Sequence, residues 1–445
     1  MKRYGLLSLL ALLVFSVLVS AQPLRGSYFF ENSLLRSKLN PAFAPQTHYV
    51  SVPVAGYASA DILSNVGLSN FLFPVDDKTY TFLNDAVDAS TFLDKLPADD
   101  PYFNAKVQTD LLGGGYRLND RIYLTASLSV TGRGNADVSR ALLEFAKKGR
   151  SGSIHSWSLP GLKAHLMSYA TLSAGCSYDM EDLVPGLRVG GRLNLMTGLV
   201  SANATLHALD IRLDDDIVSA TTRGNIGLAG FAYDLEGGFR SEKLKLRGFG
   251  ASVDLGAEYR LRFDGFVNGL NLSASVGNLG RLSFGSANML SADGSASFEG
   301  FNQIGDENFD LPAALDKVIE DFSSLTSLTP VGATPLDYIL DAEIYAGAEV
   351  PFLNDMLSAG ILYSRYLSKS HFTLSFNASP LEWLNLNASY TFGPTNRMGF
   401  YAEYIPKKYV GFFFGFEKAS FKTNRNLLGV KNFTESLCLG LNILL

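Results

Sequence analysis

The sequence predicts an all-β protein, a transmembrane antiparallel up-and-down β-barrel of about 14 strands, with 12 to 16 fitting the pattern. Long segments alternate apolar and polar residues, short turn signals separate them, and no apolar block after the first 21 residues could form a spanning helix. Apolar residues nevertheless make up 47% of the chain and charged residues only 18%. A barrel in lipid explains this composition, because only half of the residues in each strand need to be apolar.

The alternation is clearest from Phe249 to Asp264, where every odd position is apolar and the even positions carry five charges. Successive side chains of a strand point to opposite faces, so one face of this segment is apolar throughout. Strands of soluble sheets usually have about five or six residues, whereas a tilted strand needs about 9–11 to cross a bilayer. The segment is therefore predicted to span a membrane.

Similar alternation recurs along the chain, mostly between turn signals such as Pro380, Gly393-Pro394 and Pro406. The further segments are 122–130, 187–195, 340–350, 372–377, 384–392, 398–404, 410–416 and 437–445. A barrel of this size is too wide for its own side chains to fill, so a plug or a channel is expected inside it.

The chain divides into three expected parts. Residues 1–21 have the pattern of a secretory signal peptide, with Lys2 and Arg3 before an apolar run and small residues before Gln22. Residues 22–100 are expected to form an N-terminal segment with a plug or hatch and a short helix, and residues 101–445 the barrel. The expected location is the outer membrane of a Gram-negative bacterium.

Three stretches are predicted as short helices in the N-terminal and loop segments, namely Asn84–Leu96, Asn135–Lys148 and Pro312–Phe322. In the second, Val138, Leu142 and Phe145 fall on one side, as in an amphipathic helix. These stretches are candidates for plugs, lids or external loops.

The stretch Gly26-Ser27-Tyr28-Phe29-Phe30-Glu31-Asn32-Ser33, with Arg36 and Leu39-Asn40-Pro41-Ala42-Phe43, resembles the opening of an uncharacterised family of Bacteroidota outer-membrane barrels, a domain of unknown function. Ser275-Val276-Gly277-Asn278-Leu279-Gly280 is similar to a strand end of FadL-like and PorV-like barrels. The FadL comparison implies that Asn40, Pro41, Ala42 and Phe43 lie inside the barrel as a hatch. The alternative is a periplasmic tail.

Charged residues on the polar faces of three predicted strands are expected to point into the barrel. They are Arg188, Arg192, Asp254, Glu258, Arg260, Arg262, Asp341, Glu343 and Glu349. Their mixed signs favour salt-bridge ladders across the wall or against a plug, whereas a ring of one sign would have indicated ion selectivity.

The sequence shows no pattern typical of an enzyme. Its five histidines have neither metalloprotease nor zinc spacing, and it has no phosphate-binding or dinucleotide-binding loop, so no cofactor or metal is expected. A net charge of −6 argues against a nucleic-acid partner. The expected function is passage or binding of a small, hydrophobic molecule through a plugged barrel, with outer-membrane lipid around it. The alternative is a non-transporting scaffold that docks partner proteins.

Overall fold

The computed structural model describes most of the chain. The described residues are 24–75, 78–84, 86–148, 156–214, 217–234, 238–243, 245–291, 294–298, 329–406, 409–419 and 434–445. The predicted signal peptide and the helix predicted at Pro312–Phe322 lie outside these residues. Over the described ranges, every helix is too short or too polar to cross a bilayer.

The described residues are mainly strands. In the first half these are β1 (Tyr49–Ser51), β2 (Ala58–Ser64), β3 (Leu72–Val75), β4 (Lys78–Thr81), β5 (Tyr102–Arg117), β6 (Ile122–Asp137), β7 (Ser156–Pro160), β8 (Lys163–Asp179), β9 (Leu187–Asp214), β10 (Ile217–Ala229), β11 (Phe231–Asp234) and β12 (Gly238–Ser241). In the second half they are β13 (Gly248–Arg262), β14 (Gly269–Ser291), β15 (Gly294–Phe298), β16 (Thr329–Ile339), β17 (Glu343–Phe352), β18 (Leu357–Tyr366), β19 (Lys369–Leu381), β20 (Leu384–Phe392), β21 (Arg397–Tyr404), β22 (Tyr409–Lys418) and β23 (Glu435–Leu444).

The large sheet closes on itself, which confirms the predicted barrel. The last strand, β23, pairs antiparallel with β22 on one side and with β1 and β2 on the other. Several strands share one position in the ring because they pair with the same neighbours: β1 with β2, β7 with β8, β10 with β13, β14 with β15, and β16 with β17. The wall therefore has 14 strands.

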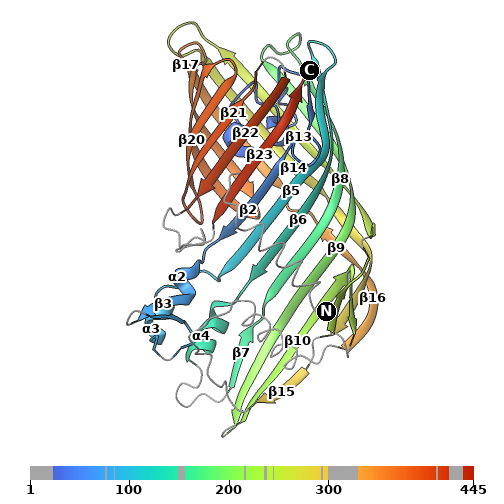
Figure 1. Ribbon diagram of the computed structural model, residues 1–445, viewed down its shortest axis with the longest axis vertical. Coiled ribbons are helices and arrows are strands. Elements are labelled where there is room, and N and C mark those ends of the chain that lie inside the picture. The colour runs from blue at the N-terminus through green and yellow to red at the C-terminus, as the bar shows by residue number, and fades with distance from the viewer. Residues whose placement is uncertain are drawn as a thin grey trace.

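Helical elements are few and short in the described part of the chain. Two 3₁₀ turns, η1 (Leu24–Ser27) and η2 (Arg36–Lys38), precede the first strand. The α-helices are α2 (Leu68–Phe71), α3 (Ala89–Leu93) and α4 (Arg140–Lys148), the last two within stretches predicted to be helical. Together with the β3–β4 hairpin they form a small body at one end of the wall (Figure 1).

The side chains of the wall follow the predicted alternation. In β13, Phe249, Val253 and Leu255 are exposed on the outer face, whereas Ser252, Asp254 and Glu258 are buried on the inner face. The same division holds in β19, where outward Phe372, Leu374 and Phe376 are exposed between buried Thr373, Ser375 and Asn377. The barrel is thus apolar outside and polar inside.

The wall begins earlier than the expected boundary at residue 101, because β1 and β2 already pair with β5 and β23. These two pieces are separated by a bulge at residues 52–57, which contains Pro53 and Gly56. Proline lacks the backbone N–H that a ladder needs. The interruption leaves each piece too short to show the long alternation by which the other strands were predicted.

The strands are much longer on one side of the barrel. Strand β9 has 28 residues and β14 has 23, whereas β17 to β23 have 8 to 13. At about 3.3 Å per residue, β9 is roughly 90 Å long, several times what a bilayer requires. Figure 1 shows β9, β10, β15 and β16 reaching far past β20 to β23 at one end.

We expect Leu255→Arg, at the middle of β13, to lower the stability of the barrel in phospholipid vesicles by roughly 2–4 kcal/mol, because it puts a charge against the lipid. Urea titration followed by heat-modifiable electrophoretic mobility measures the loss. Leu246→Arg is the matched control, since Leu246 is exposed in the loop before β13 and should change little. Equal effects of both changes would contradict a lipid-facing β13.

Candidate functional site

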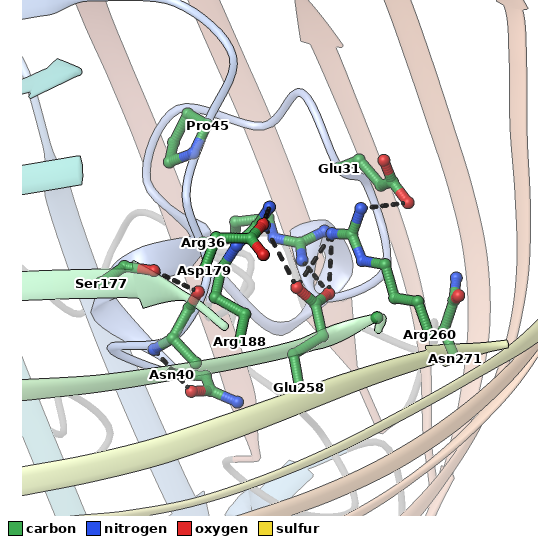
Figure 2. A network of polar contacts seen from close by, with 12 residues as sticks. Glu31, Arg36, Asn40, Pro45, Ser177, Asp179, Arg188, Glu258, Arg260 and Asn271 are labelled. Atoms are coloured by element: carbon green, nitrogen blue, oxygen red, sulfur yellow. Dashed lines mark hydrogen bonds and ion pairs between the residues drawn. The ribbon is translucent and has the colours of Figure 1, made fainter. Parts of the chain in front are cut away.

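Residues 24–45, here called the N-terminal segment, lie inside the ring of strands. Their side chains and backbone contact inward-facing residues of β5, β8, β9, β13, β14 and β20 to β22. The segment forms only turns and two 3₁₀ helices, since Pro41 and Pro45 do not fit a regular helix interior or an inner strand. Figure 2 shows part of it over the inner face of the wall.

Of the four residues predicted to form a hatch, Asn40 and Ala42 make polar contacts with the wall. The Asn40 side-chain amide donates to the carbonyl oxygens of Ala257 at 3.1 Å and Ala274 at 3.3 Å. Its Oδ1 accepts the Ala42 N–H at 2.9 Å, and the Ser177 hydroxyl donates to the Ala42 carbonyl at 2.7 Å. Asn40 therefore holds a local turn and at the same time links two neighbouring strands, β13 and β14.

Aromatic rings anchor the same part of the segment. The rings of Tyr28 and Phe43 meet edge to face with centroids 5.0 Å apart, and both pack with Tyr345 of β17 in one buried cluster. The Arg36 guanidinium lies 3.8 Å from the centre of the Phe43 ring. Burial of these rings supplies apolar contact area between the segment and the wall, and a second such cluster joins Phe30 and Leu34 to Phe413.

A buried carboxylate on β13 is the centre of the polar network in Figure 2. Glu258 accepts from Arg36 of the segment at 2.7 Å, and from the wall residues Arg260 at 2.9 Å and Arg188 at 3.4 Å. Asp179 forms a second ion pair with the Arg188 guanidinium, at 2.8 Å. One carboxylate thus offsets charges from both the segment and the wall, so substitution of Glu258 is expected to destabilise the barrel.

Further ion pairs tie both ends of the segment to other strands. Arg25 contacts Glu417 of β22 at 2.8 Å, and Arg397 of β21 shares that carboxylate at 3.5 Å. Lys38 contacts Asp110 of β5 at 2.8 Å. In addition, the Arg192 guanidinium donates to the backbone carbonyls of Ser37 and Lys38. The segment is therefore fixed to opposite sides of the ring.

Glu31 faces three guanidiniums. It contacts Arg260 at 2.7 Å and Arg262 at 2.9 Å, and Arg36 lies nearby. Burial alone would raise the pKa of the Glu31 carboxyl, but these arginines hold that pKa below its usual range. Glu31 therefore stays ionised and paired at neutral pH.

The nine predicted inward charges all make polar contacts. Besides the pairs above, Arg192 contacts Asp254 at 3.4 Å, Arg262 contacts Asp355 at 3.7 Å, and Glu349 accepts from Ser358 at 2.5 Å and Asn271 at 2.8 Å. Asp341 and Glu343 pair with Arg133 and Lys106. The sequence did not predict a charged contact in the lumen for Arg25, Glu31, Arg36, Lys38, Lys106, Asp110, Arg133, Arg397 and Glu417, although Glu31 and Arg36 lie in the stretch that carries the family resemblance.

Glycines on the inner face make room for the segment. A β-carbon at Gly190 of β9 would overlap the Pro41 carbonyl, and one at Gly256 of β13 would overlap the Asn40 side chain. A β-carbon at Gly360 of β18 would lie 2.5 Å from the Phe29 ring. Glycine has no side chain, so a glycine within a strand often marks a place where another backbone approaches closely.

The described residues hold no group of three histidine, cysteine, aspartate or glutamate side chains that could bind a metal ion. What they do define is a class of protein: a closed antiparallel barrel of 14 strands that encloses its own N-terminal segment. The chain belongs to a family of unknown function, DUF5723, whose model matches residues 41–415. No curated protein matches the chain.

The chain is also similar to solved structures of other proteins. The Pseudomonas putida toluene transporter TodX is 12% identical with a TM-score of 0.45, over 91% of this chain and 92% of that one. A Pseudomonas aeruginosa FadL homologue is 13% identical with a TM-score of 0.41, over 94% and 95%. The CymD monoaromatic hydrocarbon channel is 10% identical with a TM-score of 0.34, over 94% of each chain.

We expect Gly190→Ala to displace the N-terminal segment and to lower stability by roughly 1–3 kcal/mol, because the new methyl group overpacks against Pro41. Limited proteolysis of the segment and urea titration measure the two effects. Gly191→Ala is the matched control, since its added β-carbon meets no atom closer than 3.8 Å. If both variants show the same proteolysis and the same stability, the close approach of Pro41 to Gly190 is not needed to keep the segment in place.

We expect Glu258→Gln to lower the free energy of unfolding by roughly 3–5 kcal/mol, because it leaves the buried Arg36 and the partly buried Arg188 and Arg260 without their shared carboxylate. Glu144→Gln is the matched control, since Glu144 pairs with Lys148 on an exposed face of α4. Urea titration in vesicles compares the two variants. A loss under about 1 kcal/mol for Glu258→Gln would contradict a central role in the network.

Proposed function

We propose that the protein is an outer-membrane channel in which the N-terminal segment closes the lumen and a small molecule passes when the segment moves. The observation that carries the proposal is the segment itself, bound to opposite sides of the ring by Arg25–Glu417 and Arg36–Glu258. The apolar outer face supports the membrane location, because a closed sheet with an apolar exterior and a polar interior suits a bilayer.

The orientation follows from the loops. Short turns connect the strands at the end where β23 finishes, for example at residues 119–121, 353–356 and 382–383. The small body and the overlong strands lie at the other end (Figure 1). Barrels of the outer membrane have short periplasmic turns and longer extracellular loops. We therefore assign the end with the short turns to the periplasm.

Deleting residues 26–45 tests the proposal. The wall retains ion pairs after the deletion, since Glu258 keeps Arg188 and Arg260, and Glu417 keeps Arg397. We expect proteoliposomes of the deletion variant to leak small solutes at least about tenfold faster than the full chain, because an unblocked barrel of this width encloses an aqueous path. Solute efflux measures the rate, and heat-modifiable mobility establishes that the variant is folded.

Matched controls are the full chain, protein-free liposomes and the double variant Glu144→Gln/Lys148→Met, which removes an exposed ion pair of α4. Efflux from the deletion variant no faster than from the full chain would count against a channel. It would favour the second candidate, a scaffold that docks partner proteins. The small body favours that candidate, because Phe73, Val87, Phe92 and Leu96 give it a core of its own apart from the wall.

A further inference from the structure

Two ion pairs cross the lumen at the outer side of the N-terminal segment. Lys106 of β5 contacts Glu343 of β17 at 2.8 Å, and Arg133 of β6 contacts Asp341, just before β17, at 2.9 Å. The strands β5 and β6 are not neighbours of β17, which pairs with β14 and β18. We call these four residues the charged belt, because they join opposite walls rather than adjacent strands.

Two further contacts also join strands that lie far apart in the ring. The Tyr366 hydroxyl of β18 donates to Asp61 of β2 at 2.6 Å. The rings of His165 on β8 and Tyr338 on β16 stack with centroids 4.5 Å apart. None of these strand pairs is adjacent in the ring. The barrel is therefore narrowed at this level by contacts of its own wall, and Arg25 of the N-terminal segment lies beside them, 5.2 Å from the centre of the Tyr366 ring.

The charged belt separates two hollows. Lys106 and Glu343 line an inner cavity of about 140 Å³, which the N-terminal segment bounds through Lys38 and Pro41. Arg133 and Asp341 line an outer hollow of about 310 Å³. A cavity of roughly 150 Å³ can hold benzene, so the inner cavity fits a solute of about six non-hydrogen atoms. Its lining is polar, with Ser129, Thr171 and Asn194 among the inward side chains.

The signs of the charged belt are segregated. Both cations come from the β5–β6 wall, and both anions from the chain at and before β17. The side chains of Lys106, Glu343 and Arg133 are at most 15% exposed. Asp61, the register partner of Lys106, adds a carboxylate on the cationic side that is already bound by Tyr366. Apart from Asp61, a solute in the gap therefore meets guanidinium and ammonium groups on one side and carboxylates on the other.

A solute that separates a buried ion pair must satisfy both partners, because a buried charge left alone is strongly unfavourable. A hydrocarbon satisfies neither charge. A simple anion or cation satisfies one and leaves the other unpaired. A zwitterion supplies a carboxylate for Lys106 or Arg133 and an ammonium group for Glu343 or Asp341.

We propose that the charged belt selects small zwitterions, which cross by replacing its two ion pairs one after the other and then occupy the inner cavity. This inference rests on the proposed passage of a small molecule through the barrel, and it names the chemical class of that molecule. It also makes the charged belt a selective constriction, which a small zwitterion can pass, whereas the N-terminal segment closes the lumen.

The test compares efflux of L-alanine, L-lactate and glycerol, which each have about six non-hydrogen atoms, the number that the cavity holds. Proteoliposomes contain the full chain or the variant lacking residues 26–45, at zero membrane potential. We expect L-alanine to cross at least about tenfold faster than L-lactate, because a site built for two polar groups rejects an analogue that lacks one. Lys106→Met/Glu343→Gln should abolish this preference.

Glu144→Gln/Lys148→Met, a pair on exposed α4, is the matched control and should keep the preference. If Lys106→Met/Glu343→Gln fails the mobility test for folding, Arg133→Met/Asp341→Asn replaces it, because Asp341 is half exposed. Equal efflux rates for L-alanine and L-lactate would overturn zwitterion selection, and so would a preference for L-alanine that persists in the variant of the charged belt. Neither result would contradict the proposed channel. If no solute crosses any form, the channel and the selectivity both fail.

Discussion

A closed ring of backbone hydrogen bonds is the constraint on which the rest of the structure depends. Once β23 has paired with β1 and β2, each of the 14 positions in the ring has a neighbour on both sides, and the alternating side chains are divided between the outer face and the lumen. The charges that fall inside must then find partners, because removal from water is costly for an unpaired charge. The N-terminal segment supplies several of these partners, so the wall and the segment are mutually dependent.

The alternation was sufficient to predict most of the wall. It did not single out β5, β8, β14 and β18. It failed where proline interrupts a strand or where both faces are exposed. The first wall strand is divided by the bulge that contains Pro53, and β16 contains Pro330 and Pro335 and is largely exposed on both faces. Such strands carry no period-two contrast, because the contrast arises only where one face is buried and the other is not.

The charged residues on the inner face could be predicted from the alternation of the strands, but their ion-pair partners could not. Glu258 and Arg260 were visible as polar positions of an alternating strand, whereas Arg36 lies in a segment without periodicity. Which charges meet across the lumen depends on the shape of the ring, as the Lys106–Glu343 pair shows. One available signal was overlooked: inward glycines such as Gly190 and Gly256 mark the strands where another backbone comes close.

The position of the N-terminal segment in the chain has a consequence for biogenesis. The segment is joined directly to the first strand of the wall, and Arg25 finds Glu417 across 392 residues of sequence. Contacts between residues so far apart in the sequence form slowly, because a long loop must close first. The seam between the first and last strands can form only after β23 has been synthesised. The leading residues must already be inside by then, so maturation of this barrel is a process of wrapping and not of later insertion.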